Sequence, residues 1–156
     1  MENKKIFCLD ANVLIKYFVH ERHTRQTIDL ITAIFDHGYR IVNPSFCKIE
    51  FYSILRKKIH FYMLVKEDAD KLGIFLADLE LLQIGWSNDS LVLQRAMELA
   101  IETQQPTIYD TLYLATAISN NAIFVTEDKS FLKKIKSIYP SSYSVEEALK
   151  MAIVWQ

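Results

Sequence analysis

Four acidic residues, far apart along the chain, each lie where an apolar strand or turn gives way to a helical pattern: Asp10, Glu50, Asp110 and Asp128. If the fold gathers these side chains, their carboxylates form an anionic pocket that divalent cations can neutralise. Oxygen ligands select Mg²⁺ or Mn²⁺ over zinc or copper, and no nearby His or Cys pair favours another metal. The pattern therefore predicts four metal-ligating catalytic acids and metal-dependent cleavage of phosphodiesters.

Asp10 and Asp128 both follow apolar strands, so their carboxylates are expected at the carboxyl edge of the sheet, where sites in α/β proteins gather. Taken singly, each is better explained as a helix N-cap, because Asp accepts hydrogen bonds from the first free N–H groups of a helix. Glu127, which precedes Asp128, is an alternative fourth acid. Asn12 and Thr126 are expected to add neutral oxygens near the acids, although Thr126 could simply end its strand.

Glu50 and Asp110 are expected on the apolar faces of their helices, beside hydrophobic or small side chains three and four positions away. An unpaired carboxylate in such surroundings costs several kcal/mol or becomes protonated. A cation should therefore compensate Glu50, either Lys57 or a metal ion. For Asp110 the competing interpretation is a capping box with Thr107 as the N-cap, and capping and metal binding are evenly matched there.

The hydrophobic pattern that must position these acids alternates between strands and helices. It predicts strands at residues 6–9, 40–42, 81–84 and 122–125, and a weaker strand near Ile138. It predicts helices that begin after Asp10 and at residues 24–36, 46–58, 65–79, 89–103, 108–119, 128–135 and 145–153. Asn43 to Ser45 should stop the second strand and cap the next helix. Such alternation implies a three-layer α/β/α sandwich with a central parallel sheet.

The composition fits one ordered domain spanning residues 1–156, because 51% of residues are hydrophobic and only 3 Gly and 3 Pro interrupt the chain. Cys8 and Cys47 lie in apolar segments and are too few for a disulfide framework or a zinc site, which favours a reducing cytoplasm. Asp10 interrupts the first apolar run too early for a signal peptide or a membrane span. The net charge of -1 neither indicates nor excludes nucleic acid.

Four segments follow one another in an informative order: Leu9–Ile15 (LDANVLI), Pro44–Glu50 (PSFCKIE), Tyr109–Ala115 (YDTLYLA) and Val125–Phe131 (VTEDKSF). Together they resemble PIN-domain nucleases, particularly the VapC-type toxins of bacterial and archaeal toxin-antitoxin pairs. The resemblance covers nearly the whole chain and implies the sandwich fold and a Mg²⁺- or Mn²⁺-dependent endoribonuclease. It also implies 5′-phosphate and 3′-hydroxyl product ends, a small antitoxin partner and a homodimer. The family's acids correspond to Asp10, Glu50, Asp110 and Asp128.

In the resulting hypothesis, the first three acids hold a metal ion that binds a phosphate oxygen and activates a water, and Asp128 positions a second ion or that water. Arg56 and Lys57 are expected to grip flanking RNA phosphates. A haloacid-dehalogenase-like phosphatase ranks lower, because its general acid would be a second Asp where this chain has Asn12. A catalytically silent module that binds RNA or a protein is the remaining alternative.

A surface for a protein partner is harder to identify. An aromatic stretch on and after the third helix could supply one, and core packing explains the same residues at least as well. The residues of this stretch are Phe51, Tyr52, Phe61, Tyr62 and Met63.

Overall fold

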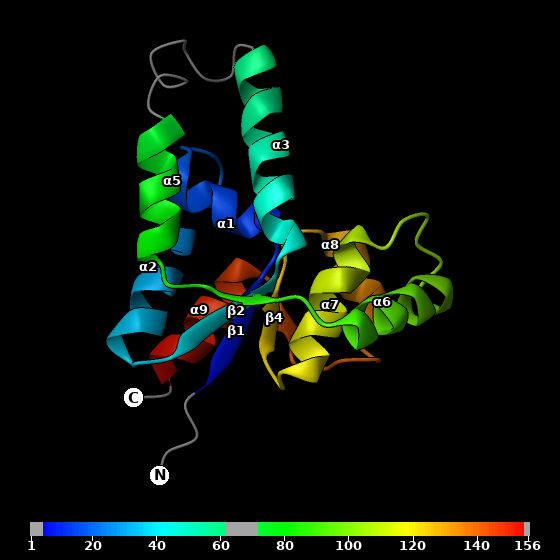
Figure 1. The fold of residues 1–156 in the computed structure, drawn as a ribbon. Helices are drawn as coiled ribbons and strands as arrows, with labels where there is room; N and C mark the ends of the chain where they lie inside the picture. The colour runs from blue at the N-terminus through cyan, green and yellow to red at the C-terminus, as the bar shows by residue number, and fades with distance from the viewer. Residues whose placement is uncertain (1–4, 62–71, 155–156) are drawn as a thin grey trace.

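The computed structural model describes residues 5–61 and 72–154, which form a central sheet with helices on both faces (Figure 1). Within these residues the sheet has five strands, all parallel, in the order β3-β2-β1-β4-β5. The strands are β1 (Ile6–Leu9), β2 (Arg40–Pro44), β3 (Gly85–Ser87), β4 (Ile123–Val125) and β5 (Ser142–Tyr143). The first and last acids of the chain thus follow the neighbouring strands β1 and β4.

Helices cover the sheet in two layers, which confirms the predicted three-layer sandwich. α7 packs on β1, β2 and β4 with α6 behind it, and α2 contacts β2, α1 and α9 on the other face. The helices are α1 (Ala11–Phe18), α2 (Thr24–Asp36), α3 (Phe46–His60), α5 (Leu72–Leu81), α6 (Ser90–Glu102), α7 (Tyr109–Ser119), α8 (Lys129–Ile135) and α9 (Val145–Val154). α3 and α5 rise beyond the carboxyl edge of the sheet and are joined by the ion pair of Lys48 and Glu80.

α7, the helix that carries Asp110, lies between the sheet and α6. Residues 111–117 of α7 are all buried. The hydroxyl of Thr111 donates a hydrogen bond to the carbonyl of Ala96 on α6, and that of Thr116 donates to Leu112, so the polar atoms of this buried face are satisfied. A helix held in this way is a rigid support for Asp110 in its first turn.

Two predicted strands are wrong. Residues 81–84 include the end of α5 and a turn with a positive φ of 48° at Gln83, and the strand begins only at Gly85. The apolar side chains of Leu82 and Ile84 are buried, so this hydrophobic run reflects core contacts around a helix end. Ile138 also lies in a turn, and the fifth strand is the short segment Ser142–Tyr143.

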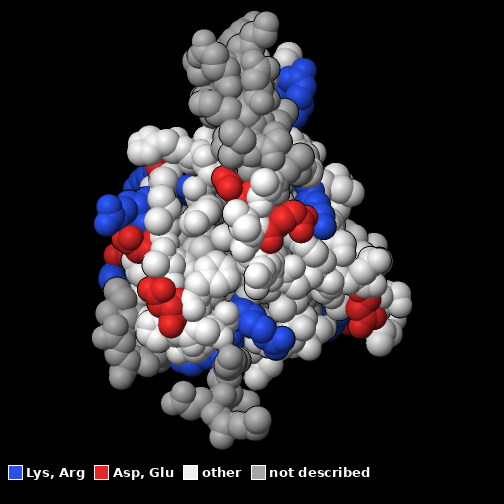
Figure 2. All heavy atoms as spheres, turned by 60° about the vertical axis from the view of Figure 1, so that its left-hand side comes forward, with Lys and Arg blue, Asp and Glu red and all other residues white. Residues whose placement is uncertain are grey.

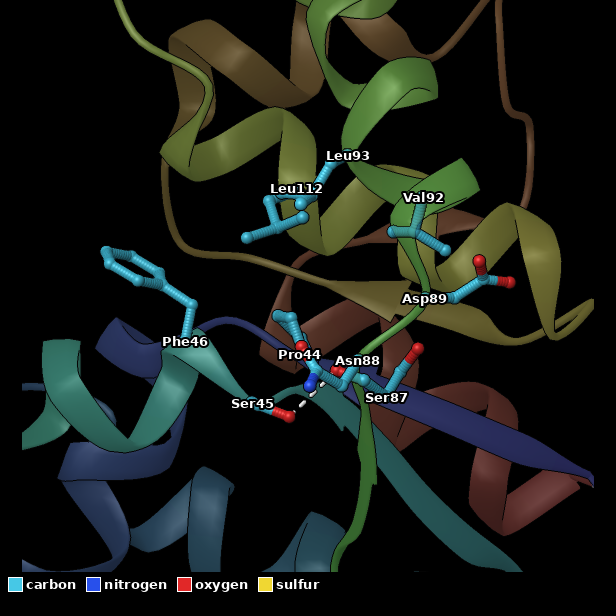
Figure 3. Close-up of a pocket in the computed structure, with 9 residues that line it drawn as sticks. All are labelled: Pro44, Ser45, Phe46, Ser87, Asn88, Asp89, Val92, Leu93 and Leu112. Carbon is cyan, nitrogen blue, oxygen red and sulfur yellow. Dashed lines mark hydrogen bonds between the residues drawn. The ribbon is translucent and has the colours of Figure 1, made fainter.

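The bounds of most other elements agree with the predicted ones within about two residues. The first part of the predicted helix 65–79 lies outside the described residues. The prediction for residues 43–45 differs from the structure. Asn43 does not stop β2, which continues to Pro44. Ser45 occupies the N-cap position of α3 without a side-chain capping bond. Its hydroxyl donates instead to the carbonyl of Ser87 at 3.0 Å (Figure 3). Ser45 therefore ties the start of α3 to the end of β3.

No helix in the described parts of the chain is both long enough and apolar enough to span a membrane. Cys8 and Cys47 are buried free thiols.

Candidate metal centre

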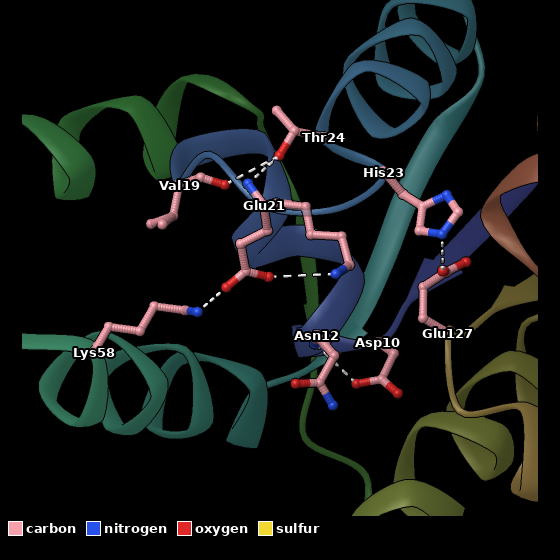
Figure 4. A network of polar contacts seen from close by, with 9 residues as sticks. Asp10, Asn12, Val19, Glu21, His23, Thr24, Lys58 and Glu127 are labelled. Atoms are coloured by element: carbon pink, nitrogen blue, oxygen red, sulfur yellow. Dashed lines mark hydrogen bonds and ion pairs between the residues drawn. The ribbon is translucent and has the colours of Figure 1, made fainter. Parts of the chain in front are cut away.

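Asp10 sits at the end of β1 and is only 2% exposed. Its backbone N–H donates to the carbonyl of Val125 on β4 at 3.0 Å. One carboxylate oxygen, Oδ1, accepts a hydrogen bond from the N–H of Asn12 at 3.1 Å (Figure 4). The other, Oδ2, accepts one from the hydroxyl of Thr126 at 2.8 Å. Asp10 is therefore an N-cap of α1, and both of its oxygens are oriented by fixed donors.

Burial is the main reason why the pKa of Asp10 rises from its ordinary value to about 7, and the negative charges of Asp110 and Glu50 raise it further. The two hydrogen bonds from Asn12 and Thr126 act in the opposite direction. The energetic preference is thus for a protonated Asp10 or for a compensating positive charge.

Asp110 does not form the capping box that was the alternative interpretation, because the N-cap of α7 is Ile108 and not Thr107. Ile108 makes no side-chain capping bond. Asp110 is half-buried in the first turn, where the positive end of the helix favours its charged form. Burial nevertheless raises its pKa, and the charge of Asp128 adds to this effect. Local capping therefore does not account for an acid at this position.

Glu50 is also half-buried, and its partner is one that the sequence interpretation missed. The phenol of Tyr113 donates a hydrogen bond to Oε2 of Glu50 at 2.8 Å. Burial raises the pKa of Glu50, as does the charge of Asp110, whereas the Tyr113 hydrogen bond and the more weakly acting Lys57 lower it. The available signal was the position of Tyr113 three residues after Asp110, on the same helix face.

Asp128 is exposed and caps α8 by accepting the N–H of Phe131 at 2.8 Å. Its own N–H donates to the hydroxyl oxygen of Thr126 at 3.2 Å. Because the same hydroxyl donates to Asp10, Thr126 connects the first and last acids. The predicted capping roles of Asp10 and Asp128 are thus confirmed, and capping still leaves both acids close to the other two.

Glu127, the alternative fourth acid, is turned to a different side. Its Oε1 accepts the N–H of Val145 at the start of α9 at 2.9 Å, and its Oε2 lies 3.8 Å from Nε2 of His23 (Figure 4). Asp128, in contrast, is the residue whose charge raises the pKa of Asp110. The geometry favours Asp128 over Glu127 as the fourth member of the group.

The four acids form a chain of electrostatically coupled pairs at the carboxyl edge of the sheet. Asp10 is influenced by Glu50 and Asp110, Glu50 by Asp110, and Asp110 by Asp128. Among the described residues, no ion pair reaches any of the four, and no three His, Cys, Asp or Glu side chains already stand close enough to share one metal ion. The carboxylates therefore lie near one another but do not form a preassembled ligand shell.

The donor set nevertheless fits a hard divalent cation. All four side chains offer only carboxylate oxygens, and three of them have pKa values raised by burial and by their acidic neighbours. Asn12 exposes its side chain beside Asp10, whereas the hydroxyl hydrogen of Thr126 is used on Asp10. Thr126 therefore orients Asp10, and its hydroxyl oxygen already accepts the N–H of Asp128.

Asn43 fixes the backbone from which Asp10 projects. Its buried amide accepts the N–H of Leu9 at 2.9 Å and donates to the carbonyl of Leu9 at 2.7 Å. This side chain replaces the missing strand partner at the end of β1. The position of the first acid is thus set by β2 as well as by β4.

The basic residues of α3 differ in whether an ion pair holds them. On α3, Lys58 pairs with Glu21, which also binds Lys16 at 3.3 Å (Figure 4). Arg56 and Lys57 are exposed on the same helix. On the face shown in Figure 2, basic and acidic side chains are interspersed among uncharged ones, which agrees with the net charge of -1.

A small pocket at the ends of β2 and β3 is distinct from the acidic group (Figure 3). It contains none of the four acids, and its only charged residue is Asp89, the N-cap of α6. The residues that line it are Pro44, Ser45, Phe46, Ser87, Asn88, Asp89, Val92, Leu93 and Leu112.

Comparison with known proteins identifies the class to which this arrangement belongs. The model of the PIN domain family matches residues 7–136, which span all four acids. Among solved structures, the crystal structure of PAE2754 from Pyrobaculum aerophilum is similar, with a TM-score of 0.67 and 18% sequence identity over 97% of this chain and 96% of that chain. The comparison with curated proteins found no match.

The chain therefore belongs to the PIN-domain family, and the solved structure agrees with its fold. Proteins of this family are typically metal-dependent nucleases. Family membership thus favours nuclease chemistry over the phosphatase and the silent binding module.

Proposed function

We propose that this protein is a Mg²⁺- or Mn²⁺-dependent endoribonuclease whose acidic centre consists of Asp10, Glu50, Asp110 and Asp128. The observation that carries the proposal is that the end of β1, α3 and α7 each bring one buried or half-buried acid to the same edge of the sheet. Burial raises the pKa of each of these acids, a neighbouring acid raises it further, and none has an ion-pair partner among the described residues. Such a group is electrostatically costly by itself and becomes favourable with a bound cation.

In this proposal Asp10, Glu50 and Asp110 hold the metal ion, and Asp128 holds a second ion or orients the attacking water. A bound divalent cation supplies charge neutralisation at the phosphate and lowers the pKa of a coordinated water. The chain itself orients the carboxylates, because Thr126 donates to Asp10 and Tyr113 donates to Glu50. Asn12 supports the centre as a neutral oxygen donor beside Asp10.

RNA is proposed as the substrate, with Arg56 and Lys57 on α3 as contacts to flanking phosphates. Both side chains are exposed on the helix that carries Glu50, and such contacts position a nucleic acid without reading its sequence. We further propose that residues 1–156 form a single domain and act in the cytoplasm. The chain is proposed to be the toxin of a toxin-antitoxin pair, with a small antitoxin and a homodimeric state.

The partner surface cannot be the whole aromatic stretch named above. Phe51 is fully buried and packs edge-on against Phe18, whereas Phe61 is exposed. Tyr62 and Met63 lie outside the described residues. Phe51 therefore belongs to the core, and an antitoxin or dimer contact through this stretch would use residues other than Phe51.

The activity is tested by incubating the purified protein with mixed-sequence single-stranded RNA and Mn²⁺ or Mg²⁺, and by sequencing the fragment ends. We expect internal cleavage with 5′-phosphate and 3′-hydroxyl ends that EDTA abolishes. Thermal stabilisation by Mn²⁺ without any cleavage would instead support a silent binding module. Turnover of a small phosphoester without RNA cleavage would support a phosphatase.

Replacing Tyr113 with Phe should weaken metal binding and cleavage roughly 10- to 100-fold, the usual effect of removing a hydrogen bond to a metal ligand. The hydroxyl lowers the pKa of Glu50, so its loss should also move the rise of activity to higher pH. Mn²⁺ titration and a pH profile measure both effects. Tyr139→Phe is the matched control, because the Tyr139 phenol donates to the carbonyl of Ala122, away from the acids. Equal losses in the two variants would contradict a role for Tyr113 at Glu50.

A further inference from the structure

Two aromatic rings stack on each other beside the acidic centre. Phe46 and Tyr109 have ring centroids 5.1 Å apart and an interplanar angle of 11°. Phe46 packs against the hydrophobic core, whereas Tyr109 is 50% exposed. Phe46 thus supports Tyr109 from the inside, and much of the tyrosine surface remains open to solvent.

The sequence positions of these rings place them next to two of the acids. Phe46 precedes Glu50 by one turn on α3, so both side chains lie on the same helix face. Tyr109 directly precedes Asp110 at the start of α7. In Figure 3 the Phe46 ring projects away from Ser45 and Ser87. The stacked pair therefore joins the two acid-bearing helices, α3 and α7.

We propose that the exposed face of Tyr109, backed by Phe46, is a stacking platform for one unpaired base of the RNA substrate, next to the phosphate that is cleaved. This inference rests on the proposed nuclease function and adds a substrate-binding residue to it. A flat ring held by a second ring loses little freedom when a base stacks on it. Base–aromatic stacking tolerates any sequence, because every base has a π-face.

The low net charge of the chain favours a contribution to RNA binding that does not depend on basic residues. The chain has a net charge of -1 and must bring a polyanion to a group of carboxylates. Stacking on Tyr109 supplies affinity without charge and requires a base that is free of its helix. The substrate class is therefore single-stranded RNA or an RNA loop.

The test compares Tyr109→Ala and Tyr109→Leu with Tyr109→Phe, in the presence of Mn²⁺ and short single-stranded RNA. We expect the Ala and Leu variants to raise KM about tenfold, within the range for loss of one stacked base, with kcat within about twofold of the parent. Tyr109→Phe keeps the ring and should behave like the parent. Phe35→Ala, which removes a 40% exposed ring from α2, is the control for truncation of a surface aromatic residue.

A second measurement uses the unaltered protein and RNAs with a single abasic position moved along the strand. We expect one position next to the cleaved bond at which the missing base raises KM about tenfold in the parent and has no further effect in Tyr109→Ala. Unchanged KM values for every abasic RNA, or a Tyr109→Ala defect confined to kcat, would overturn the platform while leaving the nuclease intact. Absence of metal-dependent cleavage by the parent would refute the proposed function itself.

Discussion

Replacing Asp10 or Asp110 with Asn is expected to reduce RNA cleavage on the order of a thousandfold or more, since a neutral amide does not supply the charge that holds the cation. The metal-free variants should be as stable as the parent or more stable at pH 8. Asn retains the capping oxygen that accepts the N–H of Asn12, and each substitution removes one of several mutually repelling carboxylates. Cleavage rates with Mn²⁺ and thermal unfolding with EDTA measure the two effects.

Asp89→Asn is the matched control for this pair of variants. Asp89 caps α6 by accepting the N–H of Leu91 at 2.9 Å, the same arrangement by which Asp10 caps α1. It lies outside the acidic group, so its substitution should leave cleavage unchanged. Full activity of both Asp10→Asn and Asp110→Asn with Mg²⁺ present would show that these acids only cap or stabilise helices, and the assignment of the metal centre would fail.

The metal-free protein is expected to lose stability as the pH rises, which is the second large effect. The pKa of Asp10 in the folded protein is about 7, compared with an ordinary value of 3.8. Between these values the unfolded chain has lost the Asp10 proton whereas the folded protein retains it, so the free energy of unfolding decreases as the pH rises. The stability associated with this group is fully present below pH 4 and lost above pH 7, on the order of 4 kcal/mol. Glu50 and Asp110 shift in the same direction.

A bound divalent cation should reverse this loss. We expect little stabilisation by Mn²⁺ at pH 5, where protons compete for the carboxylates, and roughly 2.7 kcal/mol at pH 8 when the free ion is about 100 times its Kd. Thermal or urea unfolding from pH 5 to pH 8, with EDTA or Mn²⁺, gives both curves. Asp10→Asn should flatten the metal-free curve. A metal-free protein that becomes more stable between pH 5 and pH 8 would contradict the raised pKa values and the electrostatic basis of the centre.

Several positions show that capping and site formation are compatible. From the sequence alone, the N-cap and metal-ligand roles of Asp10 and Asp128 are alternative interpretations. In the structure both residues cap helices and remain electrostatically coupled to other acids. A carboxylate has two oxygens with more than one lone pair each, so a hydrogen bond to a backbone N–H leaves further acceptor capacity. Helix capping in fact fixes the direction in which these acids point.

The sequence by itself determined the parallel sandwich, most helix bounds, the strands before Asp10 and Asp128, and the caps at those two residues. These features depend on local hydrophobic periodicity and on side chains that bond to N–H groups two or three positions away. Periodicity failed for β3 and β5, which have only three and two residues. β4 is also only three residues long, but its sequence Ile-Phe-Val is a recognisable apolar run. β3 (Gly-Trp-Ser) and β5 (Ser-Tyr) contain no such run and are defined by pairing with their neighbours.

Only the tertiary structure decided how the acids are held. Tyr113 reaches Glu50 across 63 positions of sequence, Thr126 reaches Asp10 across 116, and Phe46 meets Tyr109 where α3 approaches α7. Hydrogen bonds and ring contacts of this kind depend on how helices pack on the sheet, and no local pattern encodes that packing. The residue types of the candidate centre are therefore visible in the sequence, whereas their coupling, orientation and supporting partners arise from the fold.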